Sequence, residues 1–383
     1  MLSRTSTAAA TATAMMMSTT TISAVTMTEP AAFSNSSNNR RKLIPDIDEK
    51  RRHLLEKHGV TIEPMEPLGS RVTGLDLFGG VTEENQEVLE ALEYEMASRG
   101  FLVFPNLGVM TPKQQIKASE LWGGREIHST HGVHPATPQE GYPHIFRLSN
   151  NPREGTLGVG PQWHNDGSFV EGTFSHVGLH LVEVPENGGG TYIAHQGAAF
   201  DMLPPEKQER WSRLASINSN SGVLHPLVHK HRMTGRRSIW LHLGMTGSVI
   251  EYLGNDKKAK GEVPYRLLNE SEMNELFTDY NGILNDGVKD GYTVNYNYKE
   301  GDFVVIDNLA VSHKASPEAH TTYQKQGLRV LHRTTVKATQ PLKPGFGLPQ
   351  ATDIYGPNPF GDDGVWIGGG IGYRFAEDLH YQN

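Results

Sequence analysis

Residues 161–169 read PQWHNDGSF, which sets a histidine, His164, two positions before a carboxylate, Asp166. On an extended strand, residues i and i+2 project from the same face, so both side chains can reach one metal ion. His-x-Asp triplets also arise by chance, and an ordinary polar turn beside a strand has the same composition. The pattern therefore predicts a metal site only if another part of the chain supplies further ligands.

A third candidate ligand lies far along the chain, in residues 301–316, which read GDFVVIDNLAVSHKAS. The apolar run FVVID is typical of a buried strand, and His313 follows just beyond its end. Two histidines and one carboxylate on one face of the ion are the donor set of mononuclear non-haem Fe(II) sites. We therefore take His164, Asp166 and His313 as the candidate metal ligands and catalytic residues.

Two arginines follow in a further strand-like run, residues 328–336, which read LRVLHRTTV. A buried guanidinium is unfavourable unless an anion pairs with it, and it grips a carboxylate in a two-pronged geometry. Arg329 and Arg333 therefore predict carboxylate partners nearby. These partners can belong to a bound ligand or to structural Asp and Glu side chains.

The composition restricts the class of protein. Of the 383 residues 37% are hydrophobic and 20% are charged, as expected of a soluble globular protein with a substantial core. The net charge of −8 and the absence of a dominant basic block argue against a nucleic-acid partner. Because there is no cysteine, disulfides and cysteine-bound metals are excluded, and a metal must be held by His, Asp or Glu. No run of about twenty apolar residues predicts a membrane span.

Three regions differ in composition. Residues 1–45 are rich in Ser, Thr, Ala and Met, which fits either a cleaved organellar presequence or a disordered tail. Residues 46–340 show no internal linker and are expected to form one domain, and residues 341–383 are a Gly- and Pro-rich extension. An intracellular location, cytoplasmic or organellar, is expected, and assembly into a homo-oligomer is left open.

The secondary-structure pattern predicts an α+β protein. Helices are expected at 46–60, at 82–100 with Thr82 as cap and Gly100 at its end, and at 111–123 with Thr111 as cap. After Gly155 the chain becomes a series of short strands with Gly and Pro turns, interrupted by helices near 204–215 and 270–279. This order favours an antiparallel β-core with helices packed outside it.

Several motifs occur in an order that resembles one known family. They are PLGSRVTGLDL (67–77), GREIHST (124–130), WHNDGSF (163–169), NGGGTYI (187–193), DNLAVSH (307–313) and LRVLHRTTV (328–336). Together, over roughly residues 60–340, they resemble the taurine dioxygenase and 2,4-dichlorophenoxyacetate dioxygenase family. The resemblance implies a double-stranded β-helix (jelly-roll, cupin-like) core and a requirement for Fe(II), 2-oxoglutarate and O2. It also implies hydroxylation of a substrate with release of succinate and CO2.

The resemblance assigns further residues position by position. Thr191 and Arg329 match the positions that hold the distal carboxylate of 2-oxoglutarate. Arg333 and His128 match residues that face the anionic group of the substrate. Two aromatic residues, Phe169 and Trp163, are expected to wall the pocket.

The sequence departs from the taurine enzyme in two places. Val159 and Gly160 stand where that enzyme has acidic and amide residues that contact the substrate amine, which argues against taurine itself. A small anionic and otherwise less polar substrate fits better, namely a sulfonate, a carboxylate or a sulfate ester. The segment between His313 and Arg329 is longer than its counterpart, and His320 within it is a rival ligand that its turn-like context places on the surface.

Two other functions share the same side chains. A non-catalytic metal-binding or sensor protein of the same fold would keep the metal ligands without needing the residues that hold 2-oxoglutarate. A zinc hydrolase would need a positioned general base and no arginine for the co-substrate. Release of succinate from 2-oxoglutarate distinguishes the oxygenase from both.

Overall fold

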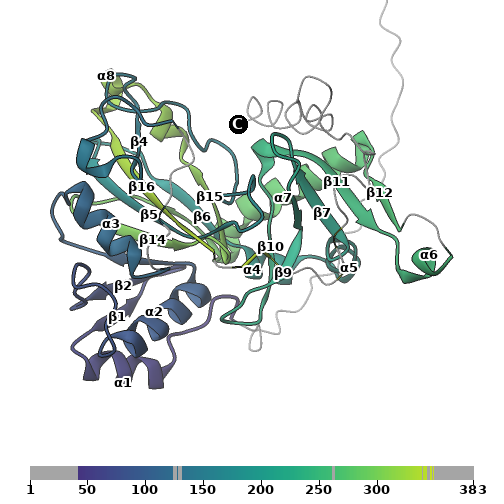
Figure 1. Cartoon of the computed structure of the whole chain (residues 1–383), viewed down its shortest axis with the longest axis horizontal. Helices are drawn as coiled ribbons and strands as arrows, with labels where there is room; N and C mark the ends of the chain where they lie inside the picture. The colour runs from purple at the N-terminus through teal and green to yellow at the C-terminus, as the bar shows by residue number, and fades with distance from the viewer. Residues whose placement is uncertain are drawn as a thin grey trace, which may run out of the picture. The chain divides into compact units, whose positions relative to one another are not determined.

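The largest sheet has seven strands, in the order β1-β2-β3-β14-β5-β16-β4 (Figure 1). This computed structural model describes residues 42–123, 127, 132–260, 264–338, 340–342, 346 and 348. Neighbouring strands of the sheet pair antiparallel, except for β2 and β3, which are parallel. The strands are β1 Thr61–Pro64, β2 Ser70–Thr73, β3 Phe101–Phe104, β14 Phe303–Asp307, β5 Phe174–Glu183, β16 Val330–Lys337 and β4 Phe146–Ser149.

A second sheet has the order β13-β6-β15, formed by Thr293–Tyr296, Thr191–His195 and Val311–Ala315. After β1 to β4, the chain forms β5 of the large sheet, crosses to the small sheet for β6 and β13, and then alternates between the two sheets through β14, β15 and β16. Side chains of both sheets share one apolar core, which includes Leu179 of β5 and Ile193 of β6. The predicted fold class, an α+β protein with a double-stranded β-helix (jelly-roll) core, is therefore confirmed.

Strand β14 is apolar from Phe303 to Ile306 because both of its faces are covered. Val304 and Ile306 point into the core between the two sheets, whereas Phe303 and Val305 point to the other face, where the N-terminal helices pack. Side chains alternate between the faces of a strand, so a strand covered on both sides reads as a continuous apolar run. This burial fixes the position of the segment that follows β14, which carries His313.

Three helices cover the outer face of the large sheet (Figure 1): α1 Glu49–Lys57, α2 Gln86–Arg99 and α3 Pro112–Glu120. Helix α3 begins as predicted, because the Thr111 side chain accepts from Gln114 N and the Gln114 side chain accepts from Thr111 N. Gly100 ends α2 as predicted. The predicted cap of α2 is wrong. The helix begins later, after Asn85, because Thr82 instead accepts a hydrogen bond from Asn85 N within the preceding turn.

Both later helices differ from their predicted extents. Helix α5, Pro205–Trp211, stops early because residues from Leu214 onward pair in a further sheet, and α7, Glu270–Asp290, runs to Gly291, whose positive φ ends it. The additional sheets are β12-β11-β7-β8 and β10-β9. The remaining elements are η1 Gln139–Gly141, α4 Gln196–Met202, β7 Leu214–Asn218, β8 Leu224–Pro226, β9 Val228–Lys230, β10 Arg237–Ile239, η2 Leu243–Met245, β11 Thr246–Tyr252, α6 Asn255–Ala259, β12 Tyr265–Leu267, η3 Pro317–His320 and α8 Tyr323–Gln326.

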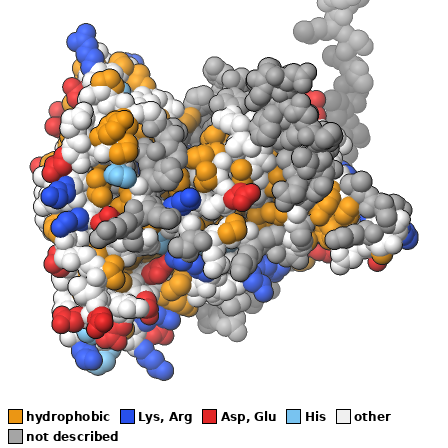
Figure 2. All heavy atoms as spheres, viewed as in Figure 1, with side chains coloured by type: hydrophobic (Ala, Val, Ile, Leu, Met, Phe, Trp, Pro, Cys, Tyr) orange, Lys and Arg blue, Asp and Glu red, His pale blue; other side chains and the backbone are white. Residues whose placement is uncertain are grey.

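The surface carries charges of both signs. Figure 2 shows acidic and basic side chains mixed on the face in view, with several of each over the α1 end. Within the described part of the chain, none of the helices is long and apolar enough to cross a bilayer.

Because several histidines of the β-core are buried, we expect the free energy of unfolding to fall in mild acid. Burial lowers the pKa of His176 to about 4, of His195 to about 3 and of His229 to about 4. The unfolded chain therefore binds protons that the folded chain does not, once the pH falls below about 6.5. The free energy of unfolding should fall from about pH 6.5 towards pH 4, by about 1.4 kcal/mol per pH unit for each histidine.

Chemical denaturation between pH 7.5 and 5 measures this slope. His229→Gln should make the slope shallower by one proton, because its amide can still donate to Leu309 O as His229 Nε2 does. His53→Gln, on the exposed side of α1, is the matched control for the substitution of a histidine by glutamine. Equal slopes in the wild type and His229→Gln would contradict the assignment.

Candidate metal centre

The two segments that carry the predicted ligands are joined directly by their backbones. His164 N donates to His313 O, and His313 N donates to His164 O, both at 3.0 Å. This isolated antiparallel pair holds the two imidazole rings 4.3 Å apart, centre to centre. The register between β15 and the 161–169 segment therefore sets the separation of the two histidines.

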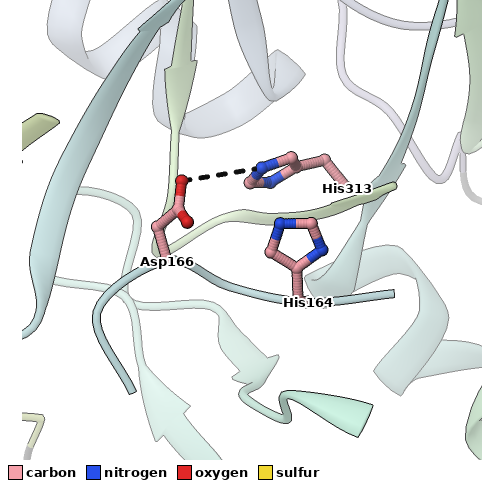
Figure 3. A group of neighbouring side chains, drawn as sticks. All are labelled: His164, Asp166 and His313. Atoms are coloured by element: carbon pink, nitrogen blue, oxygen red, sulfur yellow. Dashed lines mark ion pairs between the residues drawn. The ribbon is translucent and has the colours of Figure 1, made fainter. Parts of the chain in front are cut away.

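The three predicted ligands converge on one point. Ligand atoms of His164, Asp166 and His313 lie within 4.8 Å of one another, and all three residues are buried. Figure 3 shows their side chains turned toward a common centre, with His313 Nε2 3.7 Å from Asp166 Oδ2. Among the described residues, this is the one group of three or more His, Asp or Glu side chains with spacing suited to a metal ion.

The protonation states of the three residues suit a metal. Burial lowers the pKa of His164 and lowers that of His313 to about 3, so both imidazoles are neutral at pH 7. Burial by itself would raise the pKa of Asp166, but Arg333 and the histidines outweigh it and the net pKa is lowered. The His164 Nδ1–H donates to Gln162 O at 2.7 Å, which leaves Nε2 free as a ligand atom.

Two buried polar atoms at this centre have no hydrogen-bond partner, Asp166 Oδ2 and His313 Nδ1. An unpaired carboxylate oxygen in a buried site is unfavourable, and a cation would satisfy it. The donor set therefore fits a divalent metal ion. Two neutral imidazoles and one carboxylate are the ligands that non-haem Fe(II) prefers.

Arg333 pairs with a structural carboxylate, one of the two kinds of partner that the sequence left open. Its Nη1 donates to Asp166 Oδ1 at 2.7 Å, both residues are buried, and the guanidinium carbon lies 4.8 Å from the centre of the Phe146 ring. The arginine thus fixes one carboxylate oxygen and leaves Oδ2 for a metal. Its Nε is buried and has no hydrogen-bond partner among the described residues.

Arg329 and Thr191 lie together in a small cavity of about 60 Å³ that also reaches His164 and His313. Arg329 is 6% exposed and its Nε donates to Gly189 O at 2.8 Å, but no described carboxylate lies within ion-pair distance of it. Burial lowers its pKa, yet a guanidinium stays charged at any physiological pH. The cavity therefore contains a cation whose counter-charge the described part of the chain does not provide.

Other residues singled out in the sequence also lie at this cavity. Val159 and Gly160 line it, and so does the exposed His320. Gly160 has φ +70°, and an added Cβ would lie 2.9 Å from His164 Cε1, so the backbone approaches the imidazole as only glycine allows. The extra length before Arg329 forms η3 and α8.

Trp163 does not wall the cavity, which corrects the prediction. It neighbours His164 and therefore points to the opposite face, where its Nε1 donates to Asn285 Oδ1 at 3.0 Å. Phe169 is half-buried and packs edge-on against Phe174, outside the lining of the cavity. His128 lies outside the described residues.

Buried amides hold the ligand segments, and sequence reasoning gave them no role. Asn308 Oδ1 accepts from Asp166 N at 2.9 Å, and its Nδ2 donates to Asp166 O at 2.9 Å and to Phe174 O at 2.7 Å. Asn165 Nδ2 donates to Asn308 O and to Val311 O, and the Gln196 side-chain amide lies against the Asn165 amide. The available signal was an amide in each ligand motif, HND and DNL.

Two more residues near the centre were missed. The His242 ring lies 5.1 Å from that of His164, centre to centre. The Tyr298 hydroxyl lies 3.0 Å from Thr191 Oγ1, and burial raises the pKa of Tyr298 to about 12, so it keeps its proton. Neither belongs to a motif with a recognisable spacing.

Asn308→Ala tests how far the amides position Asp166. The change removes three hydrogen bonds and leaves Asp166 N without its side-chain acceptor in the core, at about 1–3 kcal/mol for a buried group left unsatisfied. We expect the affinity for Mn(II) to fall about 10- to 100-fold, as is usual when a residue that orients a metal ligand is lost.

Mn(II) titration of the folded variant measures this effect, and Asn255→Ala, at the exposed start of α6, is the control. If Asn308 had a purely structural role, the variant would unfold at a lower temperature, but its folded form would bind Mn(II) with the affinity of the wild type. That result would contradict the positioning role.

A double-stranded β-helix with two histidines and one carboxylate facing one another inside it defines a mononuclear metal enzyme of the non-haem iron oxygenase class. The family described as "Taurine catabolism dioxygenase TauD, TfdA family" matches residues 42–335. The chain therefore belongs to the TauD/TfdA family of Fe(II)- and 2-oxoglutarate-dependent dioxygenases.

Individual proteins are similar over most of their length. Pentalenolactone F synthase of Streptomyces arenae is 26% identical over 297 residues, covering 66% of this chain and 88% of that protein. An alkylsulfatase of Acinetobacter baylyi is 22% identical over 275 residues, covering 65% and 77%. The crystal structure of AAD-2 in complex with Mn(II) and N-oxalylglycine has a TM-score of 0.56 at 22% identity, covering 74% of this chain and 99% of that one.

Proposed function

We propose that this dioxygenase hydroxylates a small organic anion with an apolar body, a sulfonate, a carboxylate or a sulfate ester. His164, Asp166 and His313 would hold Fe(II). Thr191 and Arg329 would hold the distal carboxylate of 2-oxoglutarate. The observation that carries the proposal is the buried, unpaired guanidinium of Arg329 in the cavity that also reaches the two histidines.

The protein's own groups have distinct tasks in this reaction. When bound, Fe(II) and 2-oxoglutarate supply the oxidising chemistry, which consumes O2, yields succinate and CO2, and hydroxylates the substrate. Arg329 would hold the distal carboxylate of the co-substrate by charge, and Thr191 would add a hydrogen bond to it. Arg333 holds the Asp166 carboxylate in one orientation. The hydroxyl of Tyr298 orients that of Thr191.

The substrate class rests on the polarity of the pocket. Val159 and Gly160 line the cavity and offer no carboxylate or amide side chain to an ammonium group. We place the anionic group of the substrate near Arg333, which keeps an unpaired Nε, together with His128, and its apolar part against Phe169. The alkylsulfatase among the similar proteins supports a sulfate ester as one member of the class.

The test is succinate formation from 2-oxoglutarate with Fe(II), O2 and ascorbate, across a panel of alkyl sulfonates, aryloxy- and alkyl-carboxylates and alkyl sulfates. We expect turnover above the uncoupled background with at least one apolar anion and none above it with taurine. Taurine as the best substrate would contradict the proposed polarity of the pocket. Fe(II) binding without succinate from any compound would favour the sensor function instead.

A further inference from the structure

A second hollow lies on the outer side of the small sheet and adjoins the cavity at the metal centre. This cleft of about 720 Å³ is bounded by β6, β15, the second half of α7 and the loops around residues 157–161 and 317–322 (Figure 1). Lys314 lines it and directly follows His313 on β15, so the two side chains point to opposite faces of the strand. The mechanism above uses none of the outward-facing side chains.

Lys314 places a cation in this cleft without a counter-charge. Its ammonium lies 5.0 Å from the centre of the Trp163 ring and 5.5 Å from that of Tyr192, and Nζ donates to Asn285 Oδ1 at 3.1 Å. Among the described residues, no carboxylate lies within ion-pair distance of it. Because an ammonium group has three N–H donors and the amide takes one, two remain for a ligand.

The walls of the cleft are largely apolar. Leu157 is 48% exposed and Val288 is 54% exposed, and both line the cleft with Pro161 and Pro317. Single exposed aliphatic side chains are ordinary on protein surfaces. Here, however, two of them share one hollow with an aromatic ring and a lone cation. Apolar walls with a few convergent polar groups are the usual composition of a small-molecule site.

We infer that this cleft is a binding site for an organic monoanion with an apolar body, such as an alkyl sulfate, with Lys314 holding the charged head. Leu157 and Val288 would contact the apolar body. One ammonium balances a single charge, which favours a monoanion over a dianion such as phosphate. The cleft shares Ser149, Gly158, Ala315, Ala319 and His320 with the cavity at the metal centre, so the occupant would lie at the outer mouth of that cavity.

Calorimetric titration of hexyl sulfate into the full-length protein tests this inference. The protein is first saturated with Mn(II) and N-oxalylglycine, so that the metal and co-substrate sites are occupied and no turnover occurs. We expect binding that weakens as the ionic strength rises, because the contact with Lys314 is partly exposed. The measurement requires no activity, so it does not depend on the proposed function.

Two variants locate the site. Lys314→Gln removes the charge and should weaken binding about tenfold, as expected for loss of a hydrogen bond to a charged group. Val288→Glu adds a negative charge to the wall at an exposed position and should weaken binding similarly without affecting the fold. Lys289→Gln, on the same helix with an 83% exposed side chain, is the matched control and should bind as the wild type does.

Each outcome bears on the inference separately from the dioxygenase activity. Wild-type affinity in both Lys314→Gln and Val288→Glu would overturn the inference, even if succinate is formed with an alkyl sulfate. Weakened binding in both variants would support it, even if no compound of the panel is hydroxylated. Because Lys314 packs on Trp163, recovery of affinity in Lys314→Arg shows that charge, rather than packing, carries the effect.

Discussion

Asp166→Ala should abolish 2-oxoglutarate turnover, and we expect succinate formation to fall at least about 100-fold. Loss of residues that merely orient metal ligands already lowers affinity or activity 10- to 100-fold, and this change removes a proposed ligand itself. It also leaves the Arg333 guanidinium buried without its carboxylate, 2.7 Å from the position of the lost oxygen. Two neutral imidazoles beside an unpaired cation form a poor site for a divalent metal.

The measurement pairs Mn(II) binding with succinate formation. Because breaking a buried ion pair destabilises a protein by about 3–5 kcal/mol, Asp166→Ala could fail to fold, and Asp166→Asn is the second variant. It keeps the shape of the side chain and an acceptor for Arg333 but lacks the charge. Asp201→Ala, which removes an exposed carboxylate paired with Arg236, is the matched control. Turnover at the wild-type rate in either Asp166 variant would disprove the assignment of this residue as a ligand.

The second large effect is expected from Arg329→Met, which should raise the KM for 2-oxoglutarate steeply while leaving the free protein at least as stable. Truncating one partner of a buried, hydrogen-bonded ion pair costs about 2–5 kcal/mol, which is about 30-fold or more in affinity. In the free protein, however, the guanidinium has no described anionic partner, so a methionine of similar size removes a buried charge. The lost hydrogen bond to Gly189 O offsets part of this gain.

These opposite effects distinguish a ligand-binding arginine from a structural one. Thermal unfolding with and without 2-oxoglutarate, together with the KM, measures both. The wild type should be stabilised by the co-substrate and the variant should not, because a ligand stabilises only the form that binds it. Arg237→Met, at an exposed position on β10, is the control. A variant that unfolds more easily but keeps its KM would show that Arg329 is structural.

Much of the centre could be predicted from local patterns. The His-x-Asp spacing places two side chains on one face of an extended segment, and the apolar run of β14 identifies a strand buried on both faces. Thr111 as the cap of α3 was equally predictable. These features depend on residues a few positions apart, where backbone geometry alone relates sequence to structure.

Two predictions failed within a local segment, and one contact depended on a distant part of the chain. Thr82 is a residue type that often caps helices, but it accepts a hydrogen bond from Asn85 N within a turn, and the helix begins after Asn85. The prediction for Trp163 ignored the alternation that sends it away from His164 and onto Asn285. The buried amide Asn308 had no spacing that could reveal its contact with Asp166.

The sequence by itself determined the types of ligand available, which side chains share a strand face, and the family to which the motifs belong. Tertiary structure alone decided that His313 pairs with His164, that Arg333 is bound to Asp166, and that Arg329 and Lys314 have no described counter-charge. The reason is physical. Side-chain direction follows from the local period of the backbone, whereas the pairing of distant segments depends on the register of the sheets and the packing of the whole core.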